Sequence, residues 1–224
     1  MKLYKFRSLG SCQDLERAQD ILETGKFWCS RFWELNDPME GVYRFNAGTL
    51  SDDFIRNLYG EKSKHAICSF SGERAFSNPL MWGYYANGFR GIAIEVEVNG
   101  DEANITKVNY ASEVANITNG ERTGDAVNRI LTTKLCCWSH EDEYRYLHKG
   151  GAGRRKIGKI TGVYFGNPYR NVVNKEDVKK NDSIRKYVRR VKSLKQTAER
   201  KGRDCLHVTV ENGQVTRSTE DAKA

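Results

Sequence analysis

Alternation of apolar and polar positions predicts strands along much of this chain. In the run GIAIEVEV, residues Ile92, Ile94 and Val96 fall on one side of an extended backbone, because successive side chains of a strand point to opposite faces. Near the C-terminus, two such runs flank Asn212 and Gly213, a dipeptide that favours a tight hairpin turn. The predicted strands are 3–7, 26–30, 65–71, 91–98, 105–111, 138–147, 159–166 and the two arms of 205–218.

A second pattern, with apolar residues three or four positions apart, predicts helices between these strands. Ser11 and Asp14 have the spacing of a capping box, and Asn78 followed by Pro79 has the order expected at a helix start. The predicted helices are 11–25, 51–60, 78–88, about 124–135 and 182–202.

The strands and helices follow one another without sustained βαβ alternation, which favours an α+β fold. We expect a twisted mixed or antiparallel sheet with short flanking helices. Residues 1–170 form the predicted core, and 171–224 add a basic helix and a β-hairpin packed on the same domain.

Composition fits a protein with a real core and no membrane span. Of the 224 residues, 38% are apolar and the mean hydropathy is −0.70, and no run approaches the roughly 20 apolar residues that a spanning helix needs. The N-terminus MKLYKFRSLG lacks the apolar stretch of a signal peptide. We therefore expect a cytoplasmic location and no membrane partner.

Positive charge is concentrated in the C-terminal part of the chain. The protein carries a net +8, yet residues 149–203 alone hold 18 Lys or Arg and 4 Asp or Glu, a net +14. This distribution predicts an anionic partner such as nucleic acid, and an ordinary solvated helix face is the alternative. The residues expected to contact phosphate are Arg154, Arg155, Arg185, Lys186, Arg189, Arg190 and Lys192.

Three polar groups on predicted strands are candidates for chemistry. Read as a strand, WSHEDEYRYL (138–147) places Glu141, Glu143 and Arg145 on one face. Arg7 closes the first strand, and the two serines of CSFS, Ser69 and Ser71, also share a face. The alternative is structural: Arg145 neutralises the two glutamates, and the serines bond to neighbouring backbone.

An aromatic segment and an acidic loop are further candidates for lining a cleft. In NPLMWGYYANGFRG, the aromatic residues Trp82, Tyr84 and Tyr85 could form a wall on which a nicotinamide or a nucleobase stacks. Core packing is the favoured explanation for Trp82 and one of the tyrosines. FWELNDPMEG reads as a rigid turn or a lid, with Asn36 and Asp37 available to line a cleft.

Six cysteines without regular spacing are expected to be reduced thiols. The segments HAIC and CCWSH bring Cys and His together but match no familiar zinc knuckle. We therefore expect no metal site.

Several segments resemble the domain-of-unknown-function family 2971, which occurs widely in bacteria and phages. They are YKFRSL, FWELNDPMEG, ICSFSGE, NPLMWGYYANGFRGIAIEVE and WSHEDEYRY, and together they cover about residues 3–166. This family has no established activity, so the resemblance supplies no function by itself.

The same polar groups are similar, more distantly, to the Arg-Ser-Glu signature of ADP-ribosyltransferases. The resemblance implies an ADP-ribosyltransferase-like fold and NAD as cofactor. Arg7 would hold an NAD phosphate or ribose, and Ser69 and Ser71 would shape the nicotinamide pocket. Glu143 would stabilise the ribosyl cation, and Glu141 would align or deprotonate the acceptor. Phe70 departs from the Ser-Thr-Ser pattern of that signature.

The leading hypothesis is therefore an NAD-consuming ADP-ribosyltransferase-like enzyme acting on nucleic acid or a nucleic-acid-associated protein. The family's occurrence suggests a toxin or phage-defence effector, which a neutralising partner protein could accompany. A non-catalytic nucleic-acid-binding or interaction protein is the first alternative. A metal-dependent nuclease using Glu141 and Glu143 is the second.

Overall fold

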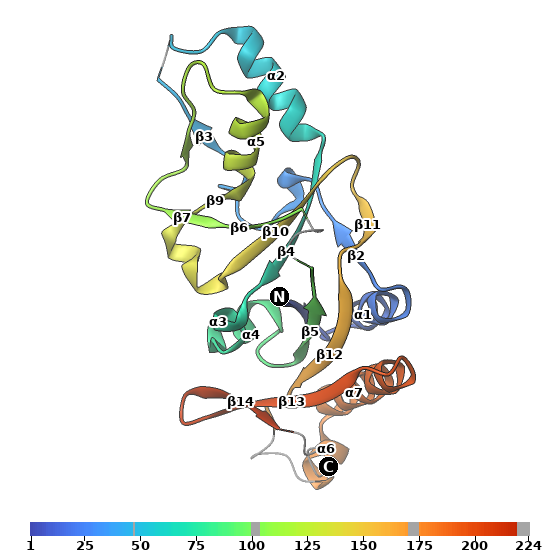
Figure 1. The fold of residues 1–224 in the computed structure, drawn as a ribbon. Coiled ribbons are helices and arrows are strands. Elements are labelled where there is room, and N and C mark those ends of the chain that lie inside the picture. The colour runs from blue at the N-terminus through green and yellow to red at the C-terminus, as the bar shows by residue number, and fades with distance from the viewer. Residues whose placement is uncertain (47, 100–103, 170–174, 219–224) are drawn as a thin grey trace. The chain divides into compact units, whose positions relative to one another are not determined.

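The structure is a computed structural model and describes residues 1–46, 48–99, 104–169 and 175–218 (Figure 1). The chain divides into two compact units. Unit 1 comprises Met1–Lys26, Phe70–Asn99 and Lys156–Ala224, and unit 2 comprises Phe27–Ser69 and Gly100–Arg155.

Unit 1 is built on a mixed sheet. Its strands lie in the order β14-β13-β12-β5-β1. Strand β13 runs parallel to β12, and the other neighbouring strands are antiparallel. The strands are β1 (Lys2–Ser8), β5 (Gly91–Glu97), β12 (Lys159–Gly166), β13 (Asp204–Glu211) and β14 (Gln214–Ser218).

Helices of unit 1 pack on this sheet around an aromatic core. They are α1 (Cys12–Thr24), α3 (Glu73–Phe76), α4 (Pro79–Tyr85), α6 (Lys175–Lys180) and α7 (Asp182–Arg200). Helices α1 and α7 lie side by side (Figure 1). Tyr4, Phe76 and Trp82 are buried together in the core, where edge-to-face ring contacts add to the free energy of burial.

Unit 2 has strands of its own. Strand β4 (His65–Ser71) neighbours β10 (Glu143–Lys149), which in turn pairs with β6 (Ile105–Lys107). Strands β2 (Lys26–Cys29) and β11 (Gly153–Lys156) form a separate pair. The last two residues of β4 belong to unit 1.

Two parallel strand pairs and four helical segments complete unit 2. The strand pairs are β3 (Tyr43–Arg44) with β8 (Ala115–Asn116) and β7 (Asn109–Ala111) with β9 (Thr133–Leu135). The helical segments are α2 (Asp52–Ser63), α5 (Thr123–Thr132) and the 3-10 helices η1 (Phe32–Glu34) and η2 (Cys136–Glu141). Helices α2 and α5 pack together over Leu58 and Ile130 (Figure 1).

The α+β class and the mixed sheet are confirmed, and the local signals are found where the sequence predicts them. Ser11 and Asp14 form the capping box of α1. Pro79 is the first residue of α4, and the side chain of Asn78 caps it. Asn212 and Gly213 both have positive φ, 51° and 77°, in the turn between β13 and β14, which is the backbone that this hairpin requires.

Five predicted elements are wrong in their extent. The helix expected over 51–60 runs to Ser63, and the helix expected over 78–88 ends at Tyr85. Residues 138–147 are not one strand, because Asp142 has a φ of 42° and separates η2 from β10. The helix expected to run to residue 135 ends at Thr132, where the chain enters β9. The strand expected over 105–111 is split into β6 and β7, which pair with different strands.

The two units do not follow the predicted boundary at residue 170. Strands β13 and β14 extend the sheet of β12, so the C-terminal hairpin is part of unit 1. Residues 170–174, which include the predicted boundary, lie outside the described residues.

Candidate functional site

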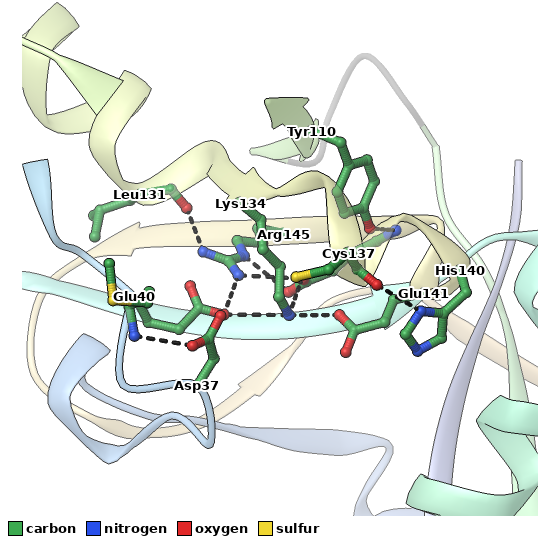
Figure 2. A network of polar contacts seen from close by, with 11 residues as sticks. Asp37, Glu40, Tyr110, Leu131, Lys134, Cys137, His140, Glu141 and Arg145 are labelled. Carbon is green, nitrogen blue, oxygen red and sulfur yellow. Dashed lines mark hydrogen bonds and ion pairs between the residues drawn. The ribbon is translucent and has the colours of Figure 1, made fainter. Parts of the chain in front are cut away.

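Unit 2 contains a buried network of five charged side chains (Figure 2). Glu143 and Arg145 come from β10, Lys134 from β9, Glu141 from the end of η2, and Glu40 from the loop after η1. Their exposed fractions run from 0% for Arg145 to 9% for Glu40. Charged groups are seldom buried this completely unless they are paired. The burial of these five side chains therefore depends on the contacts that they make with one another.

The guanidinium of Arg145 joins two of the carboxylates. Its Nε donates to Glu143 Oε1 at 2.8 Å, and its Nη2 donates to Glu40 Oε1 at 2.6 Å. Nη1 donates to the backbone carbonyl of Leu131 at 2.7 Å (Figure 2). Each nitrogen of the guanidinium therefore has a partner, which is the condition under which a buried arginine is tolerated.

The ammonium of Lys134 lies among three carboxylates. Its Nζ is 2.5 Å from Glu141, 3.2 Å from Glu143 and 3.3 Å from Glu40. Burial alone would lower the pKa of Lys134, but the surrounding carboxylates raise it above its usual range. Lys134 is therefore charged, and the three carboxylates around its ammonium stabilise a cation at this position in unit 2.

Glu143 is held in its ionised form. Burial would raise its pKa, yet the charge and hydrogen bonds of Arg145, the charge of Lys134 and a hydrogen bond with the Ser69 side chain lower it well below its ordinary value. The backbone N–H of Glu143 donates to the hydroxyl of Tyr110 at 2.8 Å, which fixes the start of β10.

The network carries an excess of negative charge. Three carboxylates face two cations, and Oε2 of Glu40 is buried without a hydrogen-bond partner among the described residues. A buried carboxylate oxygen without a donor costs free energy, so this atom is a candidate for contact with a ligand.

Glu40 also lines a cavity of about 450 Å³ in unit 2. A cavity of this size is within the range of small-molecule sites. The FWELNDPMEG segment supplies most of its wall, including Asp37, as the sequence indicated for that residue. The lining residues are Phe32, Trp33, Leu35, Asp37, Pro38, Glu40, Gly41, Val42, Tyr43 and Lys62.

The structure brings together three of the predicted catalytic and NAD-binding residues. Ser69, Glu141 and Glu143 all belong to unit 2, where Lys134 contacts both glutamates and Ser69 contacts Glu143. Arg7, on β1, and Ser71, at the end of β4, belong to unit 1. Glu141 lies on η2 and not on the strand face expected for it.

The predicted aromatic wall is wrong for Trp82. Its ring is fully buried, stacks on Phe89 at 5.4 Å between ring centroids, and its N–H donates to the Phe76 carbonyl. No ring face is left for a ligand. Tyr85 packs against the same core, whereas Tyr84 is 66% exposed.

The predicted phosphate-binding residues of α7 differ in what they contact. Arg185 and Lys186 form ion pairs with Asp182, and Arg190 donates to the backbone carbonyl of Leu9 at 2.6 Å. Arg189 and Lys192 are exposed. Arg190 therefore has a structural contact, and the exposed basic face is narrower than the sequence suggested.

Arg154 and Arg155 lie on β11 in unit 2, apart in the chain from the basic helix. Arg155 donates to the backbone carbonyls of Arg154 and Gly151. Arg154 is exposed.

All six cysteines fall within the described residues, and none of them forms a disulfide. In the described ranges, no group of three or more His, Cys, Asp or Glu side chains could hold a metal ion. The helices in those ranges are also too short or too polar to cross a membrane.

Sequence reasoning missed Glu40 and Lys134 as parts of the site. The only local signal for Lys134 is a lysine that follows two threonines and precedes an apolar run in ILTTKLCCW, and Glu40 has no signal beyond the NDPM turn before it. Their partners lie as much as 105 residues away in the chain, so spacing alone could not reveal them.

Comparison with protein-family models, with curated proteins and with solved structures finds no match for this chain.

Proposed function

We propose that this protein is an NAD-consuming ADP-ribosyltransferase-like enzyme whose reacting carboxylates are Glu143 and Glu141. The observation that carries the proposal is the hydrogen bond between Ser69 and an ionised, buried Glu143. These residues come from neighbouring strands and are 74 positions apart in the chain, and they are the Ser and Glu of the signature.

The electrostatics of unit 2 suit the reaction. Breaking the bond between nicotinamide and ribose sends the electron pair to nicotinamide and leaves positive charge on the ribose, which a fixed carboxylate stabilises. In the structure the ammonium of Lys134 lies among Glu40, Glu141 and Glu143. The same three carboxylates would stabilise a ribosyl cation there.

The proposed reaction has a requirement that can be tested. Glu143 is 3% exposed, so a substrate reaches its carboxylate only if a side chain that contacts it moves, and we propose that Lys134 moves. The acceptor oxygen or nitrogen then bonds to ribose C1, and its proton passes to Glu141 as general base. Lys134 would in this way act as a gate that holds the site closed without substrate.

The experiment is turnover of labelled NAD with candidate acceptors, nucleic acid and protein, by the wild type and two variants. We expect Glu143→Gln to lower turnover by about 100-fold or more, and Ser69→Ala, which removes one hydrogen bond, by roughly tenfold. Glu211→Gln, on the exposed end of β13, is the matched carboxylate control and should leave turnover unchanged.

Thermal unfolding of each variant separates loss of function from loss of fold, because Glu143→Gln leaves two buried cations with less negative charge. The proposal fails if calorimetry detects no NAD binding by the wild type and no acceptor is modified. It also fails if folded Ser69→Ala and Glu143→Gln both turn over NAD at the wild-type rate.

Binding of nucleic acid through α7 is a second candidate function. The exposed Arg189 and Lys192, together with the largely exposed Lys186, project from one helix in the most basic part of the chain. Contacts of this kind bind phosphate without reading sequence. For the nuclease alternative, the described residues offer no metal-binding group.

A further inference from the structure

The cavity beside Glu40 is also lined by a buried lysine, Lys62, for which no ion pair is found among the described residues. Lys62, on α2, is 4% exposed, and its Nζ donates to the backbone carbonyl of Gly41 at 2.7 Å. Among the described residues Lys62 forms no ion pair, and its ammonium lies 4.3 Å from the centroid of the Phe32 ring and 5.1 Å from that of Tyr43.

Burial of this kind is costly. Desolvation lowers the pKa of Lys62, because the aromatic rings and one carbonyl replace only part of the water that an ammonium loses. An ammonium has three N–H donors, and one hydrogen bond leaves donors available to an acceptor in the cavity.

Glu40 presents the complementary group in the same cavity. Its Oε1 is held by Arg145 and Lys134, and its buried Oε2 has no donor among the described residues. Glu40 and Gly41 are adjacent in the chain, and Gly41 is where Lys62 is anchored. The lining of one cavity therefore includes a residue with a buried carboxylate oxygen that lacks a donor and a residue whose ammonium has one hydrogen bond.

Most of the remaining wall is apolar, and Asp37 adds a further carboxylate. Phe32, Trp33 and Tyr43 contribute rings, and Pro38 and Val42 contribute aliphatic surface. Trp33 is 55% exposed, so its side chain has surface to stack against a planar ligand. The backbone of Gly41 has a φ of 72° and lies so close to Phe32 that a Cβ there would be 2.7 Å from the ring. Only glycine, which has no Cβ, allows the backbone at position 41 to lie this close to the Phe32 ring.

We propose that this cavity binds a planar aromatic ring whose edge carries a hydrogen-bond acceptor beside an amino donor. Lys62 would donate to the acceptor, Oε2 of Glu40 would accept from the amino group, and Trp33 would stack on the ring. An aromatic carboxamide such as nicotinamide and an aminated nucleobase such as adenine or cytosine share this edge. The inference stands on the cavity and does not depend on ADP-ribosyl transfer.

The test is calorimetric titration of the full chain with nicotinamide, adenosine and cytidine. Two of the probes are compared with partners that lack the amino donor: nicotinic acid for nicotinamide, and purine riboside for adenosine. We expect each loss of the amino donor to weaken binding by roughly tenfold or more. Tighter binding of nicotinamide than of the nucleosides would identify a carboxamide ligand, and the reverse order would identify a nucleobase.

Variants tie the binding to the cavity. Lys62→Met removes the donor and should weaken binding by roughly tenfold, and Trp33→Ala should weaken it by about fivefold or more through lost stacking. Trp28→Ala is the matched control, because Trp28 lies on β2, is 56% exposed, and does not line the cavity. Trp33→Ala also covers the case in which Lys62→Met fails to fold, since it changes an exposed side chain.

Three results would overturn the inference. The first is that none of the three probes binds at millimolar concentration. The second is that purine riboside and nicotinic acid bind as tightly as adenosine and nicotinamide. The third is that Trp28→Ala weakens binding as much as Trp33→Ala. Loss of NAD turnover without loss of probe binding would count against the proposed enzyme only, so the two proposals can fail separately.

Discussion

Arg145 shows how one residue can determine the stability of unit 2. Its side chain is completely buried and bridges Glu40 and Glu143, residues from two distant parts of the chain. Removing one member of a buried ion pair leaves the partner charge without compensation, and the cost is much larger than for an exposed pair.

We therefore expect Arg145→Ala to lower the free energy of unfolding by about 3–5 kcal/mol. Urea denaturation followed by circular dichroism measures this loss. Arg122→Ala is the matched control, because Arg122 pairs with Asp125 on the surface at 2.7 Å, and its loss should cost less than about 1 kcal/mol. Equal effects of the two substitutions would show that the buried network contributes no more to the free energy of unfolding than an exposed ion pair does.

The ionised state of Glu143 predicts a dependence of stability on pH. Its folded-state pKa lies below the ordinary value of 4.5, so the folded chain binds fewer protons there than the unfolded chain. The stabilisation is fully present above pH 4.5 and is lost as the pH falls below it. The stability difference between wild type and Glu143→Gln, measured by denaturation from pH 7 to pH 3, should be constant above 4.5 and shrink below it. A difference that does not change with pH would contradict this assignment.

At the scale of single elements, local signals were sufficient where the structure depends on neighbours in sequence. The capping box of α1, the Pro79 start of α4 and the Asn212-Gly213 turn all follow from contacts within a few residues. The boundary between η2 and β10 does not, since it depends on the left-handed backbone at Asp142. Nothing in the alternation of WSHEDEYRYL reveals that residue's conformation.

The capping box gives a prediction at this scale. The Ser11 hydroxyl accepts from the backbone N–H of Asp14 at 3.1 Å, and the Asp14 carboxylate accepts from the backbone N–H of Ser11. Ser11→Ala should therefore cost about 1 kcal/mol of stability, seen as a lower denaturation midpoint with an unchanged slope. Ser112→Ala, at an exposed position outside any helix or strand, should leave the midpoint where it is.

For the molecule as a whole, the sequence predicted the α+β class but could not predict the site. Glu40 and Arg145 meet across 105 positions, and Lys62 and Gly41 meet across 21. Such contacts depend on how strands are ordered in a sheet, which no periodic pattern records. Ser69 and Glu143 were singled out because each shares a face of a predicted strand with a second polar residue and because their types fit a known signature. The cation between the glutamates, Lys134, was not anticipated.

The asymmetry of charge gives a test of the proposed binding of nucleic acid. If Lys186, Arg189 and Lys192 each neutralise a phosphate, affinity for duplex DNA should fall by a factor on the order of tens between 50 and 200 mM salt. Reversing these three charges to Glu should flatten that dependence, as measured by fluorescence anisotropy. The charge-matched control reverses Arg56, Lys64 and Arg122, three exposed residues of unit 2. If the control flattens the salt dependence equally, α7 is not the binding surface.

The assignment of segments to the two units has a consequence for how this protein can be divided. The chain passes from one unit to the other four times, after residues 26, 69, 99 and 155. No single cut can therefore release either unit whole, and a fragment such as 1–170 would lose β13 and leave one edge of β12 open. We therefore expect a proteolytic cut in either unit to affect both units. We also expect that neither unit can be transferred to another protein as one continuous segment.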